Sequence, residues 1–255
     1  MKQLQGKVAL VGGAGRNNGK AIALAFAREG ADLILVAREK KESLDEVANE
    51  CEKLGAKTIS LLADVSDYEQ VNRMAKQGLD HFGHVDVLMS IAGRRTPQNF
   101  WEISYEEWHK TFEVNLHSCF YLAKTIAPAM MARGKGGSIV ALGGMASITS
   151  QPKRAHVVAS KTGLYGLIKT LALELGPYNI RANLIALSTI NNVRANPELY
   201  PDRINGEYTK EELAGIALGR TGTAQEVANV AVFLASQQSS YVTGDRIMCA
   251  GGKYM

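Results

Sequence analysis

Short apolar runs of strand length alternate with amphipathic stretches along the whole chain. In the longer stretches apolar residues recur at helical spacing, which is the main sequence signal for a helix. The predicted strands are Val8–Val11, Asp32–Val36, Thr58–Leu61, Val85–Ser90, Ser138–Leu142, Ile180–Ile185 and Arg246–Cys249. The predicted helices are Gly19–Glu29, Lys41–Leu54, Asp67–Phe82, Tyr105–Arg133, Ala155–Leu175 and Ala224–Ala235. Nearly continuous apolar strands between helices predict an α/β fold, a single-domain Rossmann-type doubly wound parallel sheet of about seven strands with helices on both faces.

Two of the predicted helices begin at residues that cap helix termini well. Ser66 or Asp67 stands at one start, and Ser104 is followed three residues later by Glu107. A serine at the N-cap and a glutamate at the third helical position each accept a hydrogen bond from the other's backbone N–H. We therefore expect a capping box at Ser104 and Glu107.

One polar segment, residues 191–215, interrupts the alternation of strands and helices. It contains Pro197 and Pro201 and lacks a helical or strand pattern. Mobile loops on a rigid scaffold often cover active sites. Within a single domain spanning residues 1–255, this segment is predicted to be either a lid-like insertion or a surface loop without a role in the site.

Composition excludes several classes of protein. The 255 residues include 29 basic and 25 acidic residues, a net charge of +4 that is spread along the chain and gives no basic patch for nucleic acid. Cys51, Cys119 and Cys249 fit neither a disulfide framework nor a metal site. No signal-peptide pattern occurs, and no apolar run reaches the roughly 18 residues of a membrane span. We therefore expect a cytoplasmic protein that binds no metal, nucleic acid or membrane.

The first predicted strand runs into a glycine-rich turn and then into a helix. Such a turn leaves backbone N–H groups exposed at the helix start, where a pyrophosphate can bind. The pattern predicts a dinucleotide site, although any strand-to-helix turn of an α/β protein can look similar. The candidate cofactor-binding residues of the turn are Gly13, Gly15, Arg16, Asn17, Asn18 and Gly19.

The end of the second predicted strand indicates which dinucleotide binds. An acidic residue near this point accepts hydrogen bonds from the adenosine ribose, whereas an arginine favours a 2′-phosphate. The chain has Ala37 followed by Arg38, and Arg16 adds a second cation nearby. We therefore predict NADP(H) in preference to NAD(H). Asp64 and Val65 end the third strand and are predicted to lie at the adenine edge.

Together these motifs resemble the short-chain dehydrogenase/reductase family over nearly the full chain. The family's T-G-x-x-x-G-x-G turn is similar to residues 12–19, with Asn17, which tolerates positive φ, in place of the middle glycine. Its N-N-A-G segment is similar to residues 90–93, in which Ala92 and Gly93 are retained as candidate cofactor-binding residues. The resemblance also implies a homodimer or homotetramer.

The resemblance assigns two candidate catalytic residues and exposes three departures. Asn115 matches the family's helix asparagine, and Lys161, which also binds the cofactor in relatives, ends its Y-x-x-x-K motif. The family tyrosine is replaced by Val157 and the family serine by Gly144, while Asn192 stands where relatives hold the nicotinamide with a threonine. A general acid contributes about 10²–10⁴-fold to a rate and one oxyanion donor about 10²–10³-fold. The resemblance therefore implies an atypical active site.

Several side chains could take over the missing proton transfer. Lys161 could donate a proton directly or through a water beside Val157, and His156 is the third candidate catalytic residue, although helix neighbours point about 100° apart. Tyr165 is predicted to be a packing residue rather than a replacement phenol. Ser147 could replace the missing serine.

Arginines near the site suggest an anionic small-molecule substrate. Arg94 and Arg95 follow the Gly93 turn, and Arg154 lies seven residues before Lys161. Guanidinium groups remain protonated, so they can bind a carboxylate but cannot act as acids. A solvated pair at Arg94 and Arg95 is the equal alternative.

The sequence thus predicts an NADP(H)-binding oxidoreductase that acts on a small carbonyl or alcohol, or on a C=C or C=N bond, through an atypical site. Two other hypotheses stay open. One is a non-redox enzyme, such as a lyase, isomerase or cyclase, and the other is a nucleotide-sensing pseudoenzyme.

Overall fold

The computed structural model describes residues 2–192 and 208–253, and its centre is one parallel sheet with the strand order β3-β2-β1-β4-β5-β6-β7. This arrangement confirms the predicted doubly wound α/β fold. The strands are β1 (Val8–Gly12), β2 (Asp32–Ala37), β3 (Thr58–Leu62), β4 (Val87–Ser90), β5 (Gly137–Leu142), β6 (Ile180–Leu187) and β7 (Arg246–Cys249).

The strand order reverses at β1, which pairs with β2 on one side and β4 on the other. The register runs from Val8 opposite Asp32 to Gly12 opposite Val36, and Gly12 also lies opposite Ser90 of β4. In open α/β sheets the crevice at the carboxyl ends of the strands, where the order reverses, is the usual ligand site. The glycine turn therefore opens at that crevice.

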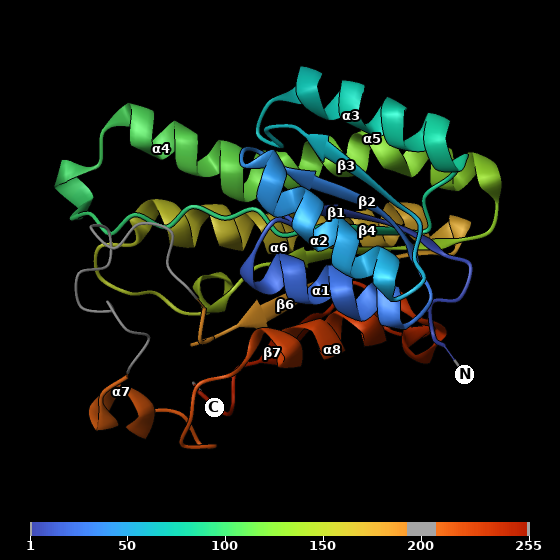
Figure 1. The fold of residues 1–255 in the computed structure, drawn as a ribbon. Coiled ribbons are helices and arrows are strands. Elements are labelled where there is room, and N and C mark those ends of the chain that lie inside the picture. The colour runs from blue at the N-terminus through green and yellow to red at the C-terminus, as the bar shows by residue number, and fades with distance from the viewer. Residues whose placement is uncertain (1, 193–207, 254–255) are drawn as a thin grey trace.

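Helices cover both faces of the sheet (Figure 1). The apolar residues of α1, α2 and α8 form one core cluster with the sheet, and those of α3, α5 and α6 form the other. The helices are α1 (Asn17–Arg28), α2 (Lys41–Lys53), α3 (Tyr68–Phe82), α4 (Tyr105–Phe112), α5 (Ser118–Arg133), α6 (Ala155–Leu175), α7 (Lys210–Ala214) and α8 (Ala224–Ala235). No helix among the described residues is both long and apolar enough to cross a membrane.

The helix predicted over Tyr105–Arg133 is not uniform. A π-helical segment, Glu113–His117, separates α4 from α5 and contains the buried Asn115. Such wide turns often occur at functional sites. Here the side chain of Asn115 forms hydrogen bonds outside its own helix, and apolar spacing alone does not reveal this change of helix type.

Strand β4 begins at Val87 rather than at the predicted Val85, and Asp86 lies directly before it. One Asp86 carboxylate oxygen accepts the backbone N–H of Val8 at 2.9 Å. Asp86 also forms ion pairs with Lys7 and Arg133, and Nε2 of His84 lies 3.3 Å from its other carboxylate oxygen. This buried carboxylate ties the start of β1 to the start of β4 and to the end of α5.

Most of the segment predicted as a lid, residues 193–207, lies outside the described residues. At its amino-terminal side, the Asn192 side chain donates a hydrogen bond to Oδ1 of Asn18 at 3.2 Å. This contact joins the segment after β6 to the glycine turn across 174 positions of the chain.

Candidate active site

The glycine turn can form only with glycine at key positions. A Cβ built at Gly19 would lie 1.9 Å from the carbonyl oxygen of Gly13, and Gly13 itself has a φ of +105°. Asn17 has a φ of 49°, a conformation that asparagine tolerates better than most residues. The turn therefore keeps its close backbone approach although Asn17 stands in the place of a glycine.

Helix α1 begins directly after this turn with an open amino terminus. Its N-cap residue, Arg16, forms no side-chain capping hydrogen bond, and the first turn contains no acidic residue. The buried Asn18 and the half-buried Gly15 lie in the same turn. Backbone N–H groups at a helix start and the helix dipole suit the pyrophosphate of a dinucleotide.

The candidate residues for the 2′-phosphate lie beside this turn. Gly15, Arg16, Asn17 and Lys20 line a hollow of about 300 Å³ with residues of α2. The guanidinium of Arg38 forms an exposed ion pair with Glu39 at 2.7 Å. An exposed pair of this kind is weak and can exchange partners, so Arg38 is available to a bound phosphate.

The other candidate cofactor residues surround the same crevice. Asp64 accepts hydrogen bonds from the backbone and hydroxyl of Ser66, which orders the turn after β3. A Cβ at Gly12 would lie 3.8 Å from the side chain of Val65, and one at Gly13 would lie 3.7 Å from the backbone nitrogen of Ala92. The structure thus brings the turns after β1, β3 and β4 together.

Lys161 lies on α6 beneath the loop that follows β4. Its Nζ donates a hydrogen bond to the carbonyl oxygen of Leu142 at 2.9 Å, and a Cβ at Gly93 would lie 3.9 Å from this Nζ. Only 7% of the residue is exposed. Burial lowers the pKa of Lys161 to about 8 because removal from water disfavours the charged ammonium.

Asn115 links the loop after β4 to α6. Its Oδ1 accepts the backbone N–H of Arg94 at 2.7 Å, and its Nδ2 donates to the carbonyl oxygen of Arg94 at 2.9 Å and to the hydroxyl of Ser160 at 3.0 Å. Ser160 directly precedes Lys161. The two candidate catalytic residues retained in the family pattern therefore lie at one site.

Val157 and Gly144 are the residues at the positions that the family resemblance assigns to the tyrosine and the serine. Val157 is buried one turn before Lys161, and Gly144 has a φ of +79°. The Ser147 hydroxyl donates to the carbonyl oxygen of Gly144 at 2.8 Å. The Tyr165 ring stacks against the guanidinium of Arg246 at 4.6 Å, as the packing interpretation of Tyr165 predicts.

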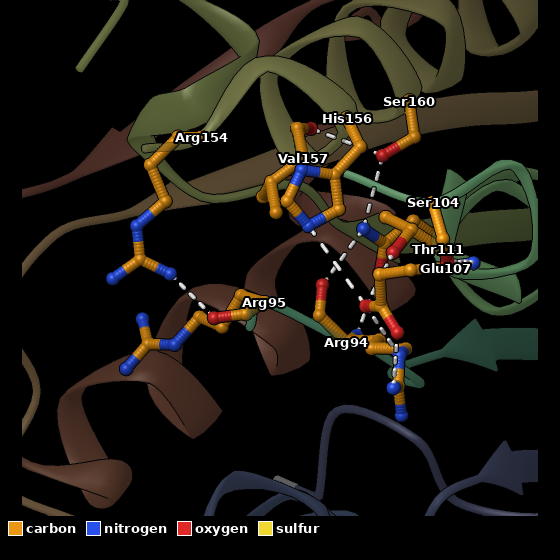
Figure 2. A network of polar contacts seen from close by, with 10 residues as sticks. Arg94, Arg95, Ser104, Glu107, Thr111, Arg154, His156, Val157 and Ser160 are labelled. Atoms are coloured by element: carbon orange, nitrogen blue, oxygen red, sulfur yellow. Dashed lines mark hydrogen bonds and ion pairs between the residues drawn. The ribbon is translucent and has the colours of Figure 1, made fainter. Parts of the chain in front are cut away.

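His156 faces a charged pair rather than open solvent (Figure 2). Its Nε2 lies 3.9 Å from Oε1 of Glu107, which is beyond hydrogen-bond distance. Glu107 holds Arg94 by two hydrogen bonds, from Nε to Oε1 at 2.9 Å and from the terminal nitrogen to Oε2 at 2.5 Å. Burial lowers the pKa of His156, and the charge of Glu107 offsets this only in part.

The three arginines differ in their surroundings. Arg94 binds Glu107, whereas Arg154 donates a hydrogen bond to the carbonyl oxygen of Arg95. Figure 2 shows the guanidinium groups of Arg154 and Arg95 on the same side of Val157, away from Glu107.

Two residues of this region were not identified as site residues from the sequence. Glu107 was expected only to cap a helix, and Cys119 was considered as a disulfide or metal candidate, which its spacing excluded. The thiol of Cys119 interacts electrostatically with Lys161, and burial raises its pKa to about 11. Cys119 follows Asn115 by four residues, so helical spacing from Asn115 was the one available signal.

Comparison with known proteins identifies the family. A family model described as Enoyl-(Acyl carrier protein) reductase matches residues 13–253. The 3-oxoacyl-(acyl-carrier-protein) reductase of Thermotoga maritima is 36% identical over 250 residues, 98% of each chain. The chain belongs to the short-chain dehydrogenase/reductase family. The L-rhamnose 1-dehydrogenase (NAD(P)(+)) of Sphingomonas sp. strain SKA58 is 32% identical over 255 residues, 100% of this chain and 99% of that protein.

Solved structures of family members have the same fold. A short-chain type dehydrogenase/reductase from Mycobacterium marinum matches with a TM-score of 0.87 and 31% identity, over 99% of this chain and 96% of that one. Carveol dehydrogenase from Mycobacterium avium in complex with NAD matches with a TM-score of 0.91 and 26% identity, over 99% of each chain. The chain is thus a member of an oxidoreductase family whose relatives bind NAD(P)(H).

Proposed function

We propose that this protein is an NADP(H)-dependent oxidoreductase that acts on a small carbonyl or alcohol, or on a C=C or C=N bond, with Lys161 in place of the family tyrosine as proton donor. The observation that carries the proposal is the position of the Lys161 ammonium. It is buried next to Gly93 and Asn115, one helical turn from Val157.

The chain's residues fit a dinucleotide. Gly13 and Gly19 have no Cβ, so a pyrophosphate can approach the backbone of the turn closely. The first turn of α1 has no side-chain cap and contributes backbone N–H groups. The charges of Arg16 and Arg38 would neutralise a 2′-phosphate, which is our reason for proposing NADP(H) rather than NAD(H). When bound, the nicotinamide ring supplies or accepts the hydride.

Lys161 then moves the proton. The ammonium on Nζ is held by the carbonyl oxygen of Leu142, which orients it without removing its charge. A general acid works best when its pKa is near the working pH, and a pKa of about 8 meets this condition far better than the usual lysine value. Lys161 therefore protonates the nascent alkoxide in the reduction direction and accepts the proton, as a neutral amine, in the oxidation direction.

Steady-state oxidation of NADPH with a panel of ketones, imines and enones tests the proposal. Reduction is expected to fall as pH rises through about 8 because Lys161 loses its proton there. Lys161→Met is expected to lower kcat by about 10²–10⁴-fold. Tight NADPH binding without turnover of any substrate in the panel would refute the proposal.

Restoring the phenol provides a second test at the same position. Val157→Tyr adds a hydroxyl one turn before Lys161, and Val157→Phe is the matched control of similar size without it. We expect kcat of Val157→Tyr to exceed that of Val157→Phe by about tenfold or more, the contribution of a positioned acid. Equal activities would show that this position does not face the reacting atoms.

Two alternative functions follow from the resemblance, because Val157 and Gly144 lack the hydroxyl groups that it implies for a reductase. Product formation that persists after NADPH is removed would favour a non-redox lyase, isomerase or cyclase. A biochemical role that survives Lys161→Ala but not Gly19→Trp would favour a nucleotide-sensing pseudoenzyme. We also propose that the substrate is anionic and binds near Arg95 and Arg154, and that the protein forms a homodimer or homotetramer.

A further inference from the structure

The loop after β4, residues 93–99, is fixed at Arg94 in two independent ways. Asn115 binds both backbone polar groups of Arg94, and Glu107 of α4 binds its guanidinium through two nearly parallel hydrogen bonds. Such bidentate pairs fix orientation as well as position. A Cβ built at the adjacent Gly93 would lie 3.9 Å from the Nζ of Lys161.

Glu107 is held in this role by its surroundings. Its side chain is mostly buried, and hydrogen bonds from Arg94 keep its pKa below the usual value. The hydroxyl of Thr111, one turn along α4, lies 3.3 Å from Oε1. The backbone N–H of Glu107 donates a hydrogen bond to the Ser104 hydroxyl at the N-cap of α4. The Glu107 carboxylate points toward Arg94 (Figure 2).

We propose that Glu107 and Arg94 are positioning residues, which press the loop 93–99 against Lys161 and so keep water away from its ammonium. This inference rests on the proposed function for its kinetic consequence, but the contact itself can be measured without turnover. With the family phenol absent, the covering loop decides how far the ammonium is desolvated. The depressed pKa of Lys161 has burial as its main cause, in agreement with this role.

His156 makes the positioning pair sensitive to pH. The groups that face His156 are Glu107 on α4, Arg94 in the loop and Arg154 at the start of α6. When His156 becomes protonated, it attracts Glu107 and competes with Arg94 for Oε1, 3.9 Å away. Because burial lowers the pKa of His156 below its usual 6.5, this competition begins only in acid.

Competitive labelling of lysines with acetic anhydride, read by mass spectrometry across pH, measures the pKa of Lys161. Glu107→Gln and Arg94→Lys, which cannot form the bidentate ion pair, are expected to raise this pKa from about 8 toward the ordinary 10.5. Hydrogen exchange at the backbone N–H of Arg94 is expected to speed up about tenfold in both variants, as local opening becomes easier. Arg220→Lys is the matched control, because Arg220 forms a bidentate pair with Glu226 on α8.

If the wild-type protein turns over a substrate, steady-state kinetics of the variants provide a further test. Both variants are expected to lower kcat about tenfold or more, with the dissociation constant of NADPH changed less than about threefold. His156→Asn is expected to remove the acid limb of the kcat profile and to keep the limb near pH 8. Labelling and exchange that match those of Arg220→Lys would overturn the inference. A wild type without turnover would refute only the proposed function, because labelling and exchange still decide the positioning role.

Discussion

The glycine turn and the Lys161 region lie in the same crevice but are held by different forces. The turn between β1 and α1 depends on backbone geometry, since a Cβ at Gly19 would strike the carbonyl oxygen of Gly13. The Lys161 region depends on side chains from separate segments, above all Asn115 and Glu107. A backbone constraint depends on residues that are neighbours in the chain, so the sequence motif that encodes it can be recognised directly. A side-chain network joins residues that are far apart in the chain, so the spacing between near neighbours does not reveal it.

The largest expected effect is that of a single methyl group in the turn. Gly19→Ala is expected to abolish NADPH binding and to lower the free energy of unfolding by about 3 kcal/mol or more, since the clash is with backbone that cannot move aside. Equilibrium urea denaturation and fluorescence titration with NADPH measure both effects. Gly166→Ala is the control, because nothing lies within 4 Å of a Cβ there, and it is expected to stabilise α6 by about 0.5–1 kcal/mol. Similar results for the two variants would contradict the backbone account.

Asp86 is a buried carboxylate at the opposite end of β4 from the crevice. It can therefore be compared with Glu107, the carboxylate of the Lys161 region. Burial alone would raise the pKa of Asp86, but hydrogen bonds from Val8 and Arg133 and the charge of Lys7 lower it overall. Asp86→Asn is expected to cost about 2–3 kcal/mol of folding free energy without a change in kcat.

The pH dependence of unfolding has a definite sign here. Because the folded-state pKa of Asp86 is below the usual aspartate value of 3.8, its stabilisation is complete above that value and is lost as pH falls through the folded pKa. Asp86→Asn should therefore flatten the acid side of the stability curve. Asp80→Asn, which breaks the exposed pair with Lys76, should change stability by less than about 1 kcal/mol. Equal effects of the two variants would show that burial does not matter at Asp86.

Gly144→Ser tests whether the backbone at position 144 can accept a serine. Gly144 has a φ of +79° and a ψ of 171°, a conformation that side chains rarely adopt. Gly144→Ser is expected to destabilise the fold by about 1–3 kcal/mol, seen as a lower Tm in thermal unfolding. Gly176→Ser, at an ordinary helical conformation in open space, is the control. A neutral Gly144→Ser would show that the turn can accept the serine without strain.

The smallest expected effect concerns the choice of nucleotide. Arg38→Ala is expected to weaken NADPH binding about tenfold, the loss of one exposed charge-assisted contact, and to leave NADH binding nearly unchanged. Titrations with both nucleotides measure this ratio. Equal weakening of both would count against a 2′-phosphate contact at Arg38.

The structure follows the sequence most closely where interactions are local. Asp67 caps α3 by accepting the backbone N–H of Gln70, as its position before an amphipathic stretch predicts. At Ser104 only half of the predicted capping box forms. Its hydroxyl accepts the N–H of Glu107, but the Glu107 carboxylate binds Arg94 instead of returning to the cap. A guanidinium thirteen residues away offers that carboxylate a stronger, charge-assisted partner than a neutral N–H.

The order of strands and helices and the glycine turn were determined by the sequence, because each is a matter of spacing between near neighbours. The tertiary structure decided that Glu107 serves Arg94 and that His156 faces Glu107. It also decided that Gly93 and Lys161 come close together. These contacts join α4, α6 and the loop after β4, and their energy comes from burial and charge pairing that exist only after the elements pack.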